Sequence, residues 1–260
     1  MPAMPKPQDA DVEAGAPAAG KAGADQAAEE AAKPAARKVA EEEDPRLRWA
    51  FVRKVYAILA LQFALTAAVS VAACLVRAVP RFFATGPPAA VWPVFIVILV
   101  SPFIVMFPML KYREKHPTNL VLLGVFTLCC SLSIAMTTST SLGKVVLQAA
   151  ILTAVAVLGL TLFTFWAVKK GYDFTFMFPF LFTCLSVLLV YLVIQIFFPL
   201  GRVAMTIYGF LATLVFSGFI IFDTHMLLKR HTYNEYVVAA IALYLDVINL
   251  FMAQMSLSFQ

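Results

Sequence analysis

Seven apolar runs, separated from one another by charged residues, prolines or glycines, follow along most of the chain. A bilayer core of about 30 Å requires about 20 apolar residues in a helix, and each run is close to that length. The links between the runs are too short to hold a soluble domain. We therefore predict an all-α polytopic membrane protein with seven transmembrane helices, at about 55–77, 92–110, 118–138, 145–167, 175–198, 203–228 and 236–258.

Residues 1–44 differ in composition from the membrane domain, residues 45–260. They contain no aromatic residue, and they are rich in Ala, Pro, Glu and Lys. Such a segment buries too little apolar surface to offset its chain entropy, so we predict a disordered acidic tail. It lacks the apolar core of a signal peptide, and the first membrane helix is therefore expected to direct insertion.

Basic residues near the ends of the predicted helices are distributed unequally between the two sides of the membrane. One side, which carries the N-terminus, has Arg46, Arg48, Arg53, Lys54, Lys111, Arg113, Lys115, Lys169, Lys170, Lys229 and Arg230, and the other has Arg77, Arg81, Lys144 and Arg202. Lys and Arg concentrate on the cytosolic side, so the N-terminus is predicted to be cytosolic and the C-terminus lumenal or external. Because these residues form short clusters between apolar runs, we expect no binding to nucleic acid.

The sequence shows no pattern of a nucleotide-binding protein or a metalloenzyme. It has no Walker loop, no Gly-x-Gly-x-x-Gly before a helix and no His-Glu-x-x-His. The four cysteines lie inside apolar runs without a Cys-x-x-Cys or Cys/His cluster, so neither disulfides nor a zinc site are predicted. We expect a protein that is not an enzyme and that uses no cofactor.

The second apolar run contains three prolines, Pro93, Pro102 and Pro108. An interior proline frees a backbone carbonyl and kinks a helix. Membrane helices tolerate this where neighbouring helices satisfy the freed group. Two interpretations remain open from the sequence, a kinked packing helix and a bend that makes room for a cavity.

Two acidic residues, Asp223 and Asp246, lie inside apolar runs. A charge at the bilayer centre costs at least about 2.5 kcal/mol, so such residues indicate a functional site. The last two helices form a hairpin whose midpoint between these acids falls between Asn234 and Glu235. Both acids would then lie level in the membrane, about 17 Å from the turn at 1.5 Å per residue.

If the two carboxyl groups meet, they share one proton and titrate as a unit. The pair would hold the helices together when singly protonated and push them apart when doubly charged, which suits the gate of a cation path. Carboxylate oxygens also bind calcium, here transiently as the permeant ion. Thr224 and Asn249 are candidate polar supports of the pair, and His225 is interpreted as an interfacial side chain.

Three segments carry a family resemblance. The segments are FDTHMLL at 222–228, ALYLDVINLF at 242–251 and REKHPTNLVLLGVFTL at 113–128. Together they resemble the transmembrane Bax-inhibitor-motif family, most closely its Lifeguard branch. The resemblance covers about residues 45–258, in which the order and spacing of the segments also match.

The resemblance implies a fold in which six helices surround the last one, and a calcium leak across endomembranes that pH gates through Asp223 and Asp246. It implies suppression of cell death and stress tolerance, with calcium, protons and cell-death regulators as partners besides the lipid bilayer. The endoplasmic reticulum or Golgi is the expected location, and the vacuole and plasma membrane are alternatives. In prokaryotic relatives a basic residue at the cytosolic end of the second helix engages the aspartates, and Arg113 and Lys115 are the candidates here.

Other functions compete with a leak channel. The main alternative is a non-conducting scaffold that binds cell-death or channel proteins. In such a scaffold the aspartates would only fix the packing of the helices. An intramembrane aspartyl protease also pairs two acids, but Asp223 and Asp246 lack the flanking glycines of that class. A seven-helix receptor would have an external N-terminus, and residues 236–260 contain no lysine for a retinal.

Overall fold

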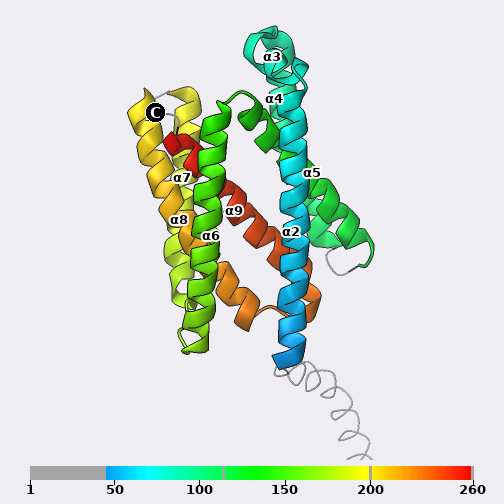
Figure 1. Cartoon of the computed structure of the whole chain (residues 1–260), viewed down its shortest axis with the longest axis vertical. Helices are drawn as coiled ribbons and strands as arrows, with labels where there is room; N and C mark the ends of the chain where they lie inside the picture. Colours follow the sequence, from blue (N-terminus) through cyan, green and yellow to red (C-terminus); the bar gives the residue numbers. More distant parts are fainter. Residues whose placement is uncertain (1–44, 113–114, 199–200, 259–260) are drawn as a thin grey trace, which may run out of the picture. The chain divides into compact units, whose positions relative to one another are not determined.

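The computed structural model describes residues 45–112, 115–198 and 201–258 (Figure 1). The predicted tail and Arg113 lie outside these residues. From Arg48 onward the described helices belong to one compact unit. The α-helices are α2 (Pro45–Leu75), α3 (Ala78–Thr85), α4 (Pro88–Lys111), α5 (Thr118–Ser139), α6 (Gly143–Lys169), α7 (Phe178–Phe197), α8 (Gly201–Lys229) and α9 (Tyr236–Ser258). The single turns η1 (Thr175–Met177) and η2 (Tyr233–Glu235) precede α7 and α9.

Seven of these helices are long and apolar enough to cross a membrane, all except α3. No strand occurs in the described part of the chain. The prediction of an all-α protein with seven transmembrane helices is therefore confirmed, and the chain is an integral membrane protein.

The structure departs from the sequence prediction around the first two helices. Helix α2 begins at Pro45 rather than near residue 55, and α3 forms where the sequence suggested only a break. Pro80 did not prevent α3 because it lies in the first turn, where backbone N–H groups have no helical partner. The helix ends at Thr85, shortly before Pro87 and Pro88, which disfavour a helical conformation at the residues before them.

Helix α9 is the most enclosed of the seven. More than half of its apolar window is buried inside the protein, whereas none of the corresponding window of α4 is. It packs against α5, α6 and α8, and in Figure 1 it runs obliquely between α6 and α2. This central position agrees with the arrangement that the family resemblance implied.

The close packing of α8 on α9 depends on Gly209. A Cβ atom at this position would lie only 3.0 Å from the carbonyl oxygen of Ala253 in α9 and 3.1 Å from Cβ of Ser256. Only glycine leaves room for so close an approach of the two backbones. The hairpin that carries both membrane acids is therefore tight at its far end.

The prolines of α4 are accommodated by a neighbouring helix. Pro102 cannot donate to the carbonyl of Ile98, and two hydroxyls take over that role. Ser101 Oγ donates to this carbonyl at 3.0 Å, and Ser133 Oγ of α5 donates to it at 3.2 Å. Because α5 satisfies the freed group, the structure favours the packing interpretation of this helix.

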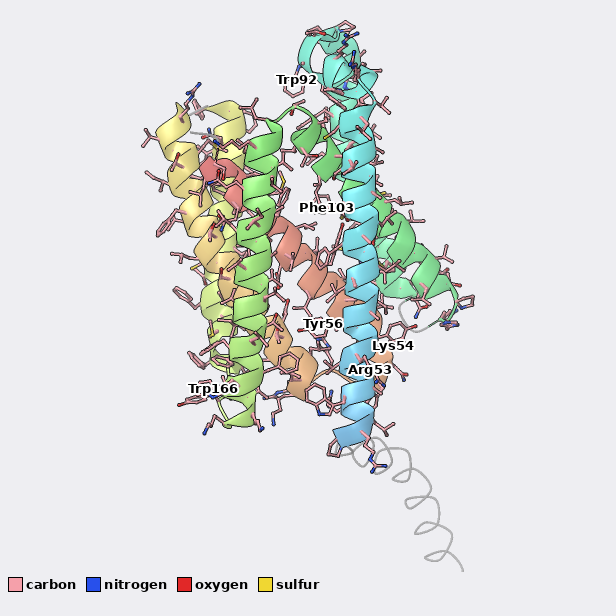
Figure 2. The ribbon with its side chains drawn as sticks, viewed as in Figure 1. Arg53, Lys54, Tyr56, Trp92, Phe103 and Trp166 are labelled. Atoms are coloured by element: carbon pink, nitrogen blue, oxygen red, sulfur yellow. The ribbon has the colours of Figure 1, made fainter. Side chains whose placement is uncertain are left out.

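Large apolar side chains cover the outside of the bundle. In Figure 2, Phe103 lies along the middle of the molecule, and Trp92 and Trp166 lie near opposite ends. All three are more than half exposed. An apolar surface with tryptophans near its two ends is typical of a protein surrounded by lipid.

Candidate functional site

The structure brings Asp223 of α8 and Asp246 of α9 together. Their carboxyl groups lie within hydrogen-bonding reach of each other. Asp246 is only 7% exposed, and its Oδ2 atom is enclosed without a hydrogen-bond partner. The short link between α8 and α9 places the two acids at the same level, as predicted from the sequence, and the packing of α8 on α9 turns them toward each other.

A hydrogen bond between two carboxyl groups requires a proton on one of them. Within the described residues no lysine or arginine forms an ion pair with Asp223 or Asp246. His231, in the link between α8 and α9, lies in the neighbourhood of Asp223. The arrangement can therefore take up and release a proton inside the membrane, and loss of that proton would leave two negative charges side by side.

The candidate supporting residues behave differently from one another. Asn249 donates its amide to the carbonyl of Leu245 at 2.8 Å, one turn earlier in α9, so this donor serves the helix backbone and not Asp246. Thr224 is fully buried, and its hydroxyl has no hydrogen-bond partner of good geometry. Thr224 thus leaves an unused polar group directly beside Asp223 in the chain.

Among the described residues, Lys115, one of the two candidates for the basic latch, forms no ion pair with the aspartates. Lys115 is exposed, and its ammonium group lies 5.4 Å from the ring centroid of Tyr112 in the same link. Its side chain contributes no ion pair in the described structure. Arg113, the other candidate, lies outside the described residues.

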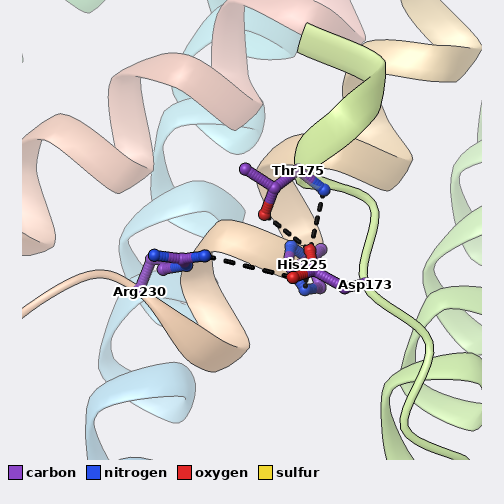
Figure 3. Close-up of polar contacts among 4 residues, drawn as sticks. All are labelled: Asp173, Thr175, His225 and Arg230. Carbon is purple, nitrogen blue, oxygen red and sulfur yellow. Dashed lines mark hydrogen bonds and ion pairs between the residues drawn. The ribbon is translucent and has the colours of Figure 1, made fainter.

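A polar cluster at the end of α8 gathers around Asp173, which was not among the candidate site residues (Figure 3). Asp173 Oδ1 accepts hydrogen bonds from the backbone N–H of Thr175, at 2.8 Å, and from the Thr175 hydroxyl. His225 Nε2 lies 3.4 Å from the same oxygen, and Arg230 lies 4.0 Å from Oδ2. The Asp-x-Thr spacing, typical of a turn that begins a helix, was the available signal.

Electrostatics in this cluster favour the charged form of Asp173. The hydrogen bonds from Thr175, followed by the nearby His225 and Arg230, lower the pKa of the Asp173 carboxyl. His225 is buried, and the ring of Phe174 meets its imidazole edge-on at 5.8 Å. The cluster therefore ties the link after α6 to the end of α8, one turn from the aspartate pair.

A second polar network crosses the bundle between α2, α5 and α9. Gln62 Nε2 donates to Thr127 Oγ1 at 2.9 Å, and Ser131 Oγ lies 3.0 Å from Thr66 Oγ1. Thr66 Oγ1 also lies 2.8 Å from the Tyr244 hydroxyl. All five residues are buried, and none is charged. The glutamine inside an apolar run was the one sequence signal for this network.

Near the start of α9, α2 makes a further set of contacts. Arg48 donates to the carbonyl of His231, and its guanidinium lies 5.7 Å from the ring centroid of Tyr233. Lys54 sits 3.4 Å above the ring of Tyr236, whose hydroxyl accepts a hydrogen bond from Asn119 at 2.8 Å. These contacts fix the link between α8 and α9, and with it the relative height of the two aspartates.

The described residues contain no group of three or more His, Cys, Asp or Glu side chains that could hold a metal ion. The carboxylate oxygens available to a cation at the pair come from Asp223 and Asp246 alone. Two such ligands suit brief contact with a passing cation better than tight binding.

The protein has seven membrane-length helices, of which the last is the most buried, and two acids are paired inside the bundle. It is therefore a polytopic membrane protein with titratable groups in its interior. Comparison with known families identifies it further. Residues 48–257 match the family described as "Inhibitor of apoptosis-promoting Bax1", and the chain belongs to this Bax inhibitor family. The family that the sequence resemblance indicated is thereby confirmed.

Individual relatives cover nearly the whole membrane domain. Protein LIFEGUARD 4 of Arabidopsis thaliana is 51% identical over 216 residues, which are 83% of this chain and 86% of the relative. Protein LIFEGUARD 3 of the same plant is 51% identical over 214 residues, 82% of this chain and 85% of the relative. The Golgi anti-apoptotic protein of Vaccinia virus (strain Lister) is 41% identical over 209 residues, 79% and 83% of the two chains.

Proposed function

We propose that this protein is a pH-sensitive calcium leak channel of an endomembrane and that Asp223 and Asp246 form its gate. The observation that carries the proposal is the contact of the two carboxyl groups between α8 and α9 inside the membrane-spanning region. Acids are rare at such positions and mark ion or proton pathways when they occur.

The gate works through the proton that the pair shares. With one proton between them, the carboxyl groups hold α8 against α9. When that proton leaves, two negative charges remain in contact, and two unit charges at a separation of about 4 Å repel each other by about 4 kcal/mol at an effective dielectric constant of 20. Separation of the helices then opens a route whose walls carry carboxylates, which attract a divalent cation.

The cellular role follows from the family. A controlled leak lowers the calcium content of a store, and we propose that this lowers the sensitivity of the cell to death signals and stress. Membership of the Bax inhibitor family and the likeness to a viral protein named for anti-apoptosis at the Golgi support this role and an endomembrane location. The unequal distribution of Lys and Arg supports a cytosolic N-terminus.

The test is calcium efflux from proteoliposomes that contain the purified full-length chain, measured from pH 5 to pH 8. Wild type is compared with Asp223→Asn and Asp246→Asn, and Asp173→Asn serves as a matched control because this acid is exposed and lies outside the pair. We expect a calcium leak in wild type whose pH dependence is abolished by either substitution in the pair and retained by the control.

Two results would contradict the proposal. A correctly folded wild-type protein that passes no calcium at any pH is not a channel, and the scaffold function then becomes the better account. A leak whose pH dependence survives both substitutions would remove the aspartate pair from gating. Under the scaffold function, Asp246→Asn would still protect cells from death stimuli.

A further inference from the structure

Three hydroxyl groups from three helices meet inside the bundle. The Tyr56 hydroxyl of α2 lies beside the hydroxyls of Thr161 in α6 and Thr224 in α8. Figure 2 shows Tyr56 on the side of α2 that faces α6, and its ring packs against Phe165 of α6 with centroids 6.3 Å apart. Thr224 directly follows Asp223 in α8. The cluster is therefore adjacent to the aspartate pair along that helix.

The protein itself does not satisfy two of these three hydroxyl groups. The Tyr56 and Thr224 hydroxyl oxygens are enclosed but form no hydrogen bond of good geometry. Thr164, one turn along α6 from Thr161, shows the ordinary behaviour: its buried hydroxyl donates to the carbonyl of Leu160 at 2.7 Å. An enclosed hydroxyl without a partner costs about 1–3 kcal/mol. The Tyr56 and Thr224 hydroxyl oxygens are thus free to accept hydrogen bonds from a ligand or to coordinate it.

We propose that Tyr56, Thr161 and Thr224 form a neutral site that takes a hydrated metal cation next to the aspartate pair. The proposal rests on the function proposed above, because it places this site on the route of calcium. Hard cations bind oxygen ligands and keep part of their water shell, and each retained water can hydrogen-bond to a hydroxyl. Three uncharged oxygens supplement the two carboxyl groups without binding the cation tightly enough to stop it.

Calcium efflux from proteoliposomes tests the site with Tyr56→Phe and Thr224→Val. Tyr56→Phe removes only the hydroxyl, and Thr224→Val replaces it with a methyl group of similar size. We expect the leak to fall about fivefold in each, the rate equivalent of one hydrogen bond of about 1 kcal/mol. Tyr191→Phe is the matched control, since this hydroxyl of α7 is also enclosed and unbonded but belongs to a ring stacked on Tyr208.

The outcomes separate the two proposals. If both variants leak at the wild-type rate while Asp223→Asn removes the pH dependence, the hydroxyl site is wrong and the channel function stands. An equal loss in Tyr191→Phe would also overturn the site, because it would show a general effect of removing a tyrosine hydroxyl. If wild type does not leak, the channel function fails, and the site is decided by chemical labelling.

Labelling needs no leak. In a chain whose four native cysteines are replaced by alanine, Thr224→Cys is treated with a small cationic methanethiosulfonate reagent, with and without calcium. We expect labelling that calcium slows, and no labelling of Thr164→Cys, which is equally buried but satisfied by its own helix. Absence of labelling at position 224, or labelling that calcium leaves unchanged, would overturn the site.

Discussion

Replacing Thr66 by valine tests whether neutral hydrogen bonds hold α2 to the centre of the bundle. Thr66 Oγ1 lies 2.8 Å from the Tyr244 hydroxyl and 3.0 Å from Ser131 Oγ. Tyr244 and Ser131 are completely buried, so water cannot replace the lost oxygen from outside. Valine fills nearly the same space but offers neither a donor nor an acceptor.

The size of the effect follows from what each partner retains. Ser131 keeps the carbonyl of Thr127, 2.6 Å away, as an acceptor, so only Tyr244 loses its bond. A buried hydroxyl without a partner costs about 1–3 kcal/mol, while hydrogen bonds between membrane helices average about 0.6 kcal/mol. We therefore expect Thr66→Val to lower the free energy of unfolding by about 1–2 kcal/mol. Adding Tyr244→Phe should cost little more, because both partners are then gone.

The assay is unfolding of the purified protein in mixed micelles by sodium dodecyl sulfate. Thr138→Val is the matched control, because Thr138 is equally enclosed in α5 but bonds only to carbonyls of its own helix, those of Ile134 and Ala135. An equal loss in Thr66→Val and the control would show that the contact with Tyr244 adds nothing. Fully additive losses in the double variant with Tyr244→Phe would likewise refute the pairing.

Two further predictions use the same unfolding assay. Ser133→Ala removes the donor that α5 provides to the carbonyl of Ile98. Because Ser101 still donates to this carbonyl, we expect the free energy of unfolding to fall by only about 0.5–1 kcal/mol. An unchanged free energy of unfolding would mean that Ser101 alone satisfies the carbonyl. Asp173 has a lowered pKa in the folded protein, so its stabilising effect is present above its unfolded pKa of about 3.9 and is lost as the pH falls through the lower folded value. Asp173→Asn should therefore reduce stability at pH 7 and flatten the acid limb, and an unchanged acid limb would contradict the assignment.

The helices could be predicted from the sequence because a bilayer sets one strong requirement, a long apolar run. The depth of Asp223 and Asp246 could also be predicted, because a short link forces two consecutive helices into a hairpin and fixes their heights. Helix α3 was missed, since its proline and arginine resemble a break when neighbouring turns are not considered.

Contacts between helices distant in the sequence could not be predicted. A transmembrane helix is apolar nearly all round, so its sequence does not show which side faces its neighbours. Gln62 signalled a polar contact but not its partner, which lies 65 residues later in α5. Asp173 and His225 met for the same reason, through the way the link after α6 folds back on α8.

The two polar sides of α9 differ in a way that bears on gating. Tyr244 and Asp246 are two residues apart, about 200° around a helix, so they lie on nearly opposite faces. Toward α2 the helix is held by the hydrogen bond between the Tyr244 and Thr66 hydroxyls, which persists across the physiological pH range. Toward α8 it is held by a carboxyl pair, whose bond needs a proton. A change of pH therefore acts on one face of α9 only. Under the proposed function, the route opens when α8 separates from α9, while α9 remains packed on α2 and α5.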